Sequence, residues 1–129
     1  MNLDQFQNLE RVGSTIYLGF NDGIDKVVFP KLKQVLGALV IESNASLREI
    51  SFPALESVAR YVHIHDNRAL ERLELPKLAT VNAEISLLDN SALAHVIVAS
   101  TSSPARLAKL ELARNKAASY PALFVLVVG

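Results

Sequence analysis

Residues 39–58 read LVIESNASLREISFPALESV, and the same order of residue types returns on both sides of this stretch. The interval can be measured on Pro30, Pro53 and Pro76, which follow one another at a spacing of 23 residues. A fixed period of this length indicates one supersecondary unit that is stacked on copies of itself. The sequence therefore predicts a short solenoid of stacked coils.

Aliphatic residues occupy fixed columns of this repeat. In each unit two of them are separated by a single residue, as in the pairs Leu39/Ile41, Val62/Ile64 and Ile85/Leu87. Alternate side chains of a β-strand point to the same face, so each pair marks the buried face of a short strand. A unit this small cannot bury that face alone, but its stacked neighbours complete a continuous core. We expect a mainly β fold with little helix, a right-handed parallel β-solenoid of four to five coils with a 23-residue period.

A single repeat domain covering residues 1–129 accounts for the pattern. Its coils are expected at about 7–29, 30–52, 53–75 and 76–98, followed by a degenerate fifth coil or cap at 99–129. Gln7 stands where the later coils have proline. Only a partial coil precedes the first full strand, so the N-terminal end of the solenoid is expected to have a thin cap.

Asparagine recurs in every coil directly after the strand, where the chain must turn. This column consists of Asn21, Asn44, Asn67 and Asn90. A carboxamide at such a turn can hydrogen-bond the peptide groups of its own turn and meet the asparagine of the next coil. We therefore predict a structural role for this column, an asparagine ladder.

The register changes after residue 98. Residues 99–106, ASTSSPAR, are small and polar, which is typical of a loop. A fifth coil with a two-residue insertion is one interpretation of the segment beyond them, on the pattern of Leu107, Leu110, Leu112 and Asn115. A helix over 104–118 is the other, because Ser103 suits an N-cap, Pro104 suits a first turn and the segment is rich in helix formers. Both stay open, and the apolar tail PALFVLVVG predicts a final buried or capping strand.

Composition narrows the function classes. Thirteen basic and thirteen acidic residues balance, which argues against nucleic acid or an anionic membrane surface as a partner. The absence of cysteine excludes disulfides and thiolate metal sites. No apolar run reaches the roughly 20 residues of a membrane span. The first residues, MNLDQFQNLERV, lack the basic start and apolar centre of a signal peptide.

The string L-x-I-x-x-N-x-x-L-x-x-I-x-F-P-x-L-x-x-V, which runs through residues 6–98, resembles the leucine-rich-repeat superfamily. Within it the chain is most similar to the receptor L domain of insulin- and EGF-type receptors and of fungal cell-wall anchored proteins. It is also similar to bacterial surface repeats of the BspA type. The resemblance implies that the outer sheet surface contacts a ligand, and it favours a secreted or cell-surface location. The receptor relatives are larger and rich in disulfides, so the lack of cysteine favours a compact microbial protein.

The middle residue of each aliphatic pair is predicted to face outward. Stacking then produces two outward columns, Tyr17, Val40, His63 and Ser86 in the first and Gly19, Glu42, His65 and Leu88 in the second. From these columns the ligand-binding candidates are Tyr17, Val40, Glu42, His63, His65 and Ser86. Phe20 and Tyr61 flank the same surface and add aromatic contact area. The alternative is a plain solvated sheet face.

The sequence His63-Ile64-His65-Asp66 is the most distinctive local feature. Both imidazoles should point the same way, with Glu42 one coil away at about 5 Å. Two histidines and a carboxylate form a weak candidate for an open zinc site, because a single His-x-His is a common pattern. We expect neither a physiological metal nor a cofactor.

No motif indicates catalysis. The sequence contains no glycine-rich phosphate loop and no G-x-S-x-G elbow. Asp66 and Asp89 are the one aligned pair of acids, and both are expected to be solvated loop residues. We therefore expect a non-catalytic module that binds a protein or glycan ligand. The alternative is a structural solenoid that associates with other copies through its coil ends, as the thin N-terminal cap suggests.

Overall fold

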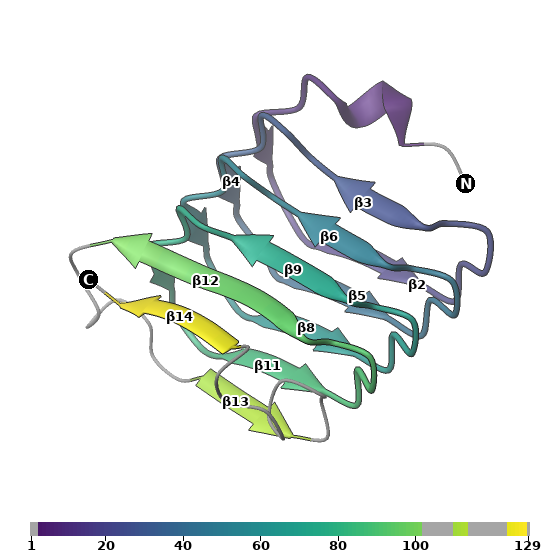
Figure 1. Cartoon of the computed structure of the whole chain (residues 1–129). Helices are drawn as coiled ribbons and strands as arrows, with labels where there is room; N and C mark the ends of the chain where they lie inside the picture. Colours follow the sequence, from purple (N-terminus) through teal and green to yellow (C-terminus); the bar gives the residue numbers. More distant parts are fainter. Residues whose placement is uncertain (1–2, 102–109, 114–123, 129) are drawn as a thin grey trace.

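A computed structural model describes residues 3–101, 110–113 and 124–128 of the chain. Short parallel strands form three sheets along the sides of a β-solenoid of about four turns (Figure 1). The short 3-10 helix η1 (Asp4–Phe6) is the one helical element among the described residues. Each of the first four coils contributes one strand to each sheet, and these strands pair in parallel. The predicted fold class, a mainly β parallel solenoid, is confirmed.

We name each sheet by its first strand. The β1 sheet contains β1 (Arg11–Val12), β4 (Gln34–Val35), β7 (Ser57–Val58) and β10 (Thr80–Val81). The β2 sheet contains β2 (Ile16–Gly19), β5 (Leu39–Glu42), β8 (Val62–His65), β11 (Ile85–Leu88) and β13 (Leu110–Ala113). The β3 sheet contains β3 (Lys26–Val28), β6 (Glu49–Ser51), β9 (Arg72–Leu75), β12 (His95–Thr101) and β14 (Phe124–Val128).

The strand register follows the sequence period. Leu39 lies opposite Val62 and Ile41 lies opposite Ile64, each 23 residues further along the chain. The aliphatic columns point between the sheets, where Ile41 and Ile64 are fully buried. The core is therefore continuous from coil to coil, because each side chain covers its counterpart one coil earlier.

A column of phenylalanine rings extends this core. The centroids of Phe29 and Phe52 are 5.1 Å apart with an angle of 4° between the rings, and Phe6 stacks on Phe29 at 6.1 Å. Such separations are within the favourable range for aromatic pairs. The column thus continues into the first, partial coil, where the distance between ring centroids is longer.

The asparagine column forms a ladder of hydrogen bonds. The backbone N–H of Asn44 donates to Oδ1 of Asn67 at 3.1 Å, and that of Asn67 donates to Oδ1 of Asn90 at the same distance. The Nδ2 of Asn67 also donates back to the carbonyl of Ile41 at 3.0 Å. Because Asn44, Asn67 and Asn90 are fully buried, these bonds satisfy polar groups that water cannot reach.

The residue before each ladder asparagine has a positive φ. The four residues are Phe20, Ser43, Asp66 and Asp89, with φ between 55° and 58°. Residues other than glycine rarely adopt this left-handed backbone conformation, and aspartate does so more readily than phenylalanine. The tight corner therefore recurs in every coil, and asparagine fixes it each time.

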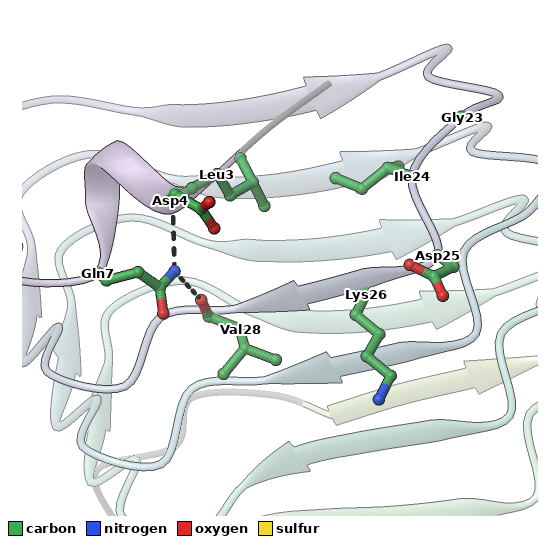
Figure 2. Close-up of a pocket in the computed structure, with 8 residues that line it drawn as sticks. All are labelled: Leu3, Asp4, Gln7, Gly23, Ile24, Asp25, Lys26 and Val28. Atoms are coloured by element: carbon green, nitrogen blue, oxygen red, sulfur yellow. Dashed lines mark hydrogen bonds between the residues drawn. The ribbon is translucent and has the colours of Figure 1, made fainter.

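The N-terminal segment lies against β3. The Nε2 of Gln7 donates to the carbonyls of Leu3 and Val28 at 3.3 and 3.2 Å, which ties η1 to the edge of the sheet (Figure 2). Gln7 thus replaces the corner proline of the later coils with a side-chain contact. Among the described residues no helix has the length and apolar composition needed to cross a membrane.

The C-terminal residues 110–113 are a strand and not a helix. Leu110 and Leu112 lie opposite Ile85 and Leu87, as the fifth-coil interpretation expects, whereas a helix over 104–118 would not pair with a sheet. Leu107, Asn115 and the remainder of that segment lie outside the described residues. In the tail, residues 124–128 form β14 and pair with β12.

The expectation of a loop at 99–106 is wrong for residues 99–101, which continue β12. Ser100 and Thr101 pair with Val127 and Val128 of β14, after a register shift beyond Val98. A tail strand from a distant part of the chain supplies the backbone partners, and small polar residues therefore adopt an extended structure. Residues 102–106 of the expected loop lie outside the described residues.

Candidate functional site

The outer face of the β2 sheet carries the two columns that the sequence places there. Tyr17, Val40, His63 and Ser86 lie opposite one another on successive strands, and so do Gly19, Glu42, His65 and Leu88. Tyr17 is 53% exposed and Phe20, at the corner after β2, is 73% exposed. Val40, Glu42, His63 and His65 are partly exposed. The predicted ligand-binding candidates therefore share one face, and all of them except Ser86 are at least partly exposed.

The exception is Ser86, which is only 4% exposed and is not available to a ligand. Its Oγ lies 2.9 Å from Nε2 of His65 on the preceding coil. A serine side chain is short and here is hydrogen-bonded to a larger imidazole, so it lies below the surface formed by its neighbours. Ser86 consequently orients His65 and does not belong to the contact surface.

Four side chains on and beside β8 stack in a row, which we call the ring strip: Arg60, Tyr61, His63 and His65. The ring centroids of Tyr61 and His63 are 4.1 Å apart, and those of His63 and His65 are 4.9 Å apart with an angle of 18° between the planes. The guanidinium carbon of Arg60 lies 5.8 Å from the centre of the Tyr61 ring. Tyr61, His63 and His65 are partly exposed, so this row of packed rings forms part of the outer face.

Hydrogen bonds to the next coil hold the two imidazoles. Nε2 of His63 lies 3.0 Å from Oε1 of Glu84, and Nε2 of His65 pairs with Ser86. Burial lowers the pKa of His65, and a charge on His63 lowers it further, while nearby carboxylates including Asp66 oppose the change. The folded chain thus favours the neutral form of His65, and the contact with Ser86 fixes the orientation of its ring.

Glu42 is paired with Tyr17. The Tyr17 Oη donates to Oε1 of Glu42 at 2.6 Å, and this hydrogen bond, with the adjacent negative charge, raises the pKa of Tyr17. The weak zinc candidate formed by His63, His65 and Glu42 is therefore not assembled. No group of three histidine, aspartate, glutamate or cysteine side chains within the described residues is placed to hold a metal ion.

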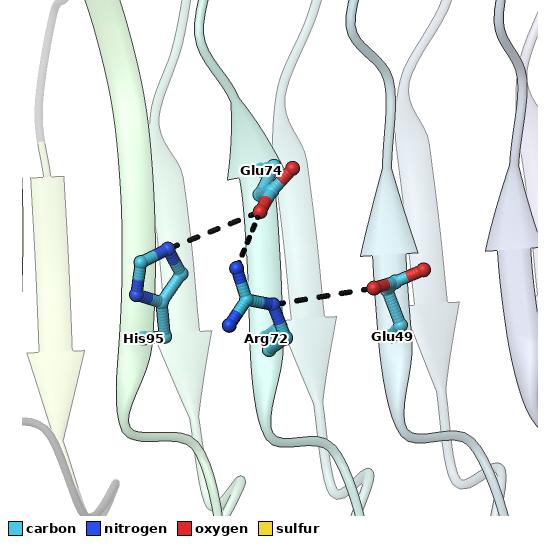
Figure 3. A network of polar contacts seen from close by, with 4 residues as sticks. All are labelled: Glu49, Arg72, Glu74 and His95. Atoms are coloured by element: carbon cyan, nitrogen blue, oxygen red, sulfur yellow. Dashed lines mark hydrogen bonds and ion pairs between the residues drawn. The ribbon is translucent and has the colours of Figure 1, made fainter.

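A charged network on the outer face of the β3 sheet was not predicted from the sequence (Figure 3). Nη2 of Arg72 lies 3.0 Å from Oε1 of Glu74, and its Nε lies 4.0 Å from Glu49. Nε2 of His95 is 3.9 Å from Glu74 and makes no hydrogen bond to the described part of the chain. The 23-residue spacing of Glu49, Arg72 and His95 was a signal that could have revealed this column. Partly exposed ion pairs of this kind contribute little stability.

A cavity at the N-terminal end was also missed. It has a volume of about 490 Å³ and is lined mainly by apolar side chains, among them Leu9, Val12, Ile16 and Leu18. The sequence predicts the thin cap that leaves this end open, but not the size of the cavity.

Comparisons with protein-family models, with curated proteins and with solved structures found no match for this chain. The fold, the geometry of the site and the sequence resemblance are therefore the basis for its proposed function. The resemblance to leucine-rich repeats stays a prediction.

Proposed function

We propose that the chain is a non-catalytic binding module that presents the outer face of the β2 sheet to a protein or glycan ligand. The ring strip on β8 carries this proposal, because it is a row of side chains fixed before any ligand arrives. Tyr61, His63 and His65 stack on one another, and the last two are hydrogen-bonded from the next coil. Preorganised side chains lose little conformational entropy on binding.

Exposed aromatic residues beside the ring strip enlarge this contact surface. Tyr17 lies on the same face and Phe20 at its corner, and both are more than half exposed. Aromatic side chains dominate the energy of many binding interfaces. The resemblance to leucine-rich repeats and receptor L domains supports the same use of the outer sheet. The proposal therefore includes that the chain is a leucine-rich-repeat protein of the cell surface.

Binding arrays provide the test. The purified chain is applied to a glycan array and to an array of purified extracellular proteins, and each ligand found is titrated by calorimetry. A double variant, Tyr17→Ala with His63→Ala, is expected to weaken binding by at least about tenfold, the size typical of hot-spot residues. The matched control is Gln34→Ala on the outer face of the β1 sheet, which should bind like the wild type. Equal binding by all three proteins would contradict the proposal.

Self-association through the coil ends stays a prediction. Sedimentation velocity over a wide concentration range measures it directly. A sedimentation coefficient that does not change with concentration would contradict it.

A further inference from the structure

The edge of β2 that faces the N-terminal end has no strand partner within the described residues. On its other edge, the N–H groups of Ile16 and Phe20 donate to the carbonyls of Ala38 and Glu42 at 2.9 and 3.2 Å. Alternate residues of a strand direct their backbone groups to opposite sides, so those of Tyr17 and Gly19 face the open edge. Such an edge is a template for another strand.

The apolar cavity lies beside this edge. Ile16 and Leu18, the inward residues of β2, line it together with Leu9, Val12 and Phe29. In the next coil Leu39 and Ile41, which correspond to Ile16 and Leu18, are fully buried under the preceding coil. The cavity is thus the place that the inward side chains of one more strand would fill.

Asn21 gives an independent indication that a strand is missing. In the inner coils the asparagine Nδ2 donates to a carbonyl of the preceding coil, as from Asn44 to Leu18 at 3.1 Å and from Asn67 to Ile41 at 3.0 Å. Among the residues that the structure describes, Asn21 has no preceding strand to bond, and its Nδ2 donates to the carbonyl of Gly19 in its own coil at 3.1 Å and to Oδ1 of Asn44 in the next coil at 3.3 Å. Its Oδ1 accepts no hydrogen bond within the described residues, whereas Oδ1 of Asn44 accepts one from the backbone of Asn21.

The N-terminal segment leaves room for one strand but not for a whole coil. η1 and Gln7 already cover the edge of β3, where Nε2 of Gln7 bonds the carbonyl of Val28 (Figure 2). In Figure 1 η1 lies beside β3, while β2 runs along a different side of the coil. A complete coil of a second copy would have to displace η1, whereas a strand along β2 would not.

We infer that the open edge of β2 is an acceptor site for an extended peptide strand of a partner protein. The strand pairs in parallel with β2, as every described strand pairs with its neighbour. Apolar side chains at alternate positions enter the cavity, and an asparagine directly after the strand meets Asn21. The backbone hydrogen bonds supply affinity and the alternate side chains supply specificity, as in other cases of β-strand addition.

The chain itself provides the probe. Residues 38–45, Ala-Leu-Val-Ile-Glu-Ser-Asn-Ala, cover the corresponding edge of β8, where Leu39 and Ser43 donate to the carbonyls of Tyr61 and His65 at 2.9 and 3.1 Å. A capped synthetic peptide of this sequence is titrated into the isotope-labelled full chain and followed by NMR. Saturable shifts at the amides of Tyr17, Gly19 and Asn21 are expected.

Two methylated peptides test the strand geometry. The Ile41 amide lies between those of Leu39 and Ser43 and points to the same side, so N-methylation at the Ile41 position should weaken binding by about tenfold or more. The Val40 amide points away, so N-methylation there is the matched control and should have a smaller effect. Equal losses for the two peptides would overturn the proposal.

A variant of the chain tests the role of Asn21. Asn21→Asp keeps the shape of the side chain but removes the Nδ2 donor, and it should weaken peptide binding about fivefold to tenfold. An unchanged thermal unfolding midpoint shows that this variant is folded as the wild type is. If the midpoint changes, the comparison of the two methylated peptides tests the proposed strand pairing instead. The proposal is overturned if the peptide does not bind at millimolar concentration, or if its shifts map to the ring strip. It is also overturned if the chain forms a dimer that the peptide fails to dissociate.

Discussion

Oη of Tyr17 lies 2.6 Å from Oε1 of Glu42, which comes two residues after Val40, the direct neighbour of Tyr17 on β5. The two side chains thus cross diagonally between the two outward columns. This bond fixes an exposed tyrosine that would otherwise move freely in solvent, and it should also control the titration of that tyrosine.

Replacement of Glu42 with glutamine should lower the pKa of Tyr17 toward its ordinary value. The hydrogen bond to the carboxylate and its negative charge both raise this pKa in the wild type. A raised pKa means that the protonated tyrosine contributes stability below the unfolded-state pKa of about 10, and that this contribution is lost as the pH rises through the folded-state value. Titration of the tyrosine Cζ resonances by NMR measures the change. A Tyr17 pKa that does not move in Glu42→Gln would contradict the assigned bond.

Acidification should destabilise the chain through His65. Burial is the first cause that lowers its pKa in the folded state. The neutral form therefore stabilises the fold above the unfolded-state pKa of about 6.5, and this contribution disappears as the pH falls through the lower folded-state value. Thermal unfolding of the wild type and of His65→Gln is compared between about pH 7.5 and about pH 4.5, a range chosen around that value. The midpoint of the wild type should fall more steeply than that of the variant, and parallel curves would show that His65 does not contribute.

The asparagine ladder should be most sensitive at its centre. Asn67→Ala removes the donor to Ile41 and the acceptor of the Asn44 backbone N–H, both in a fully buried place. Leaving such groups unpaired costs about 1–3 kcal/mol each, so we expect a loss of about 3 kcal/mol or more in the free energy of unfolding. Asn21→Ala, at the open end, should cost less. Urea unfolding of both variants measures the difference, and similar losses would mean that position in the ladder does not matter.

The left-handed backbone at Ser43 should determine how substitutions at this position change the stability of the fold. This residue has a φ of 55°. A β-branched residue is poorly tolerated there, so Ser43→Val should lower the free energy of unfolding by about 1–2 kcal/mol. Ser43→Asn should be neutral or slightly stabilising, because asparagine adopts this conformation more readily. The same urea experiment compares the two, and equal stability of both variants would contradict the assigned corner.

The repeat made most of the backbone predictable. A spacing of 23 residues places Ile41, Ile64 and Leu87 in one column, and the strand register results from that spacing. It also shows which residues face outward. The spacing does not show which outward side chains hydrogen-bond one another, because these contacts run diagonally between columns. Glu42 therefore bonds Tyr17, and His63 bonds Glu84, a residue outside both predicted columns.

The errors lie where the repeat ends or where side-chain length matters. Residues 99–101 look like a loop on composition, but they pair with β14 from a distant segment. Ser86 occupies an outward position, yet a short side chain beneath an imidazole is buried. At the other end, Gln7 stands in the proline column and donates a hydrogen bond from its side chain to the carbonyl of Val28. The repeating pattern of residue types does not predict any of these contacts.

The direction of the ladder bonds has a consequence for how such a molecule can change in length. Asn21, Asn44 and Asn67 each donate their backbone N–H to the carboxamide of the asparagine in the next coil, so these three junctions between coils have the same polarity. A duplicate of residues 53–75 inserted after residue 75 would meet both neighbours through these same junctions. Gene duplication could therefore lengthen the molecule in whole coils. A duplicate that is one residue shorter than the repeat would instead turn buried aliphatic side chains toward water.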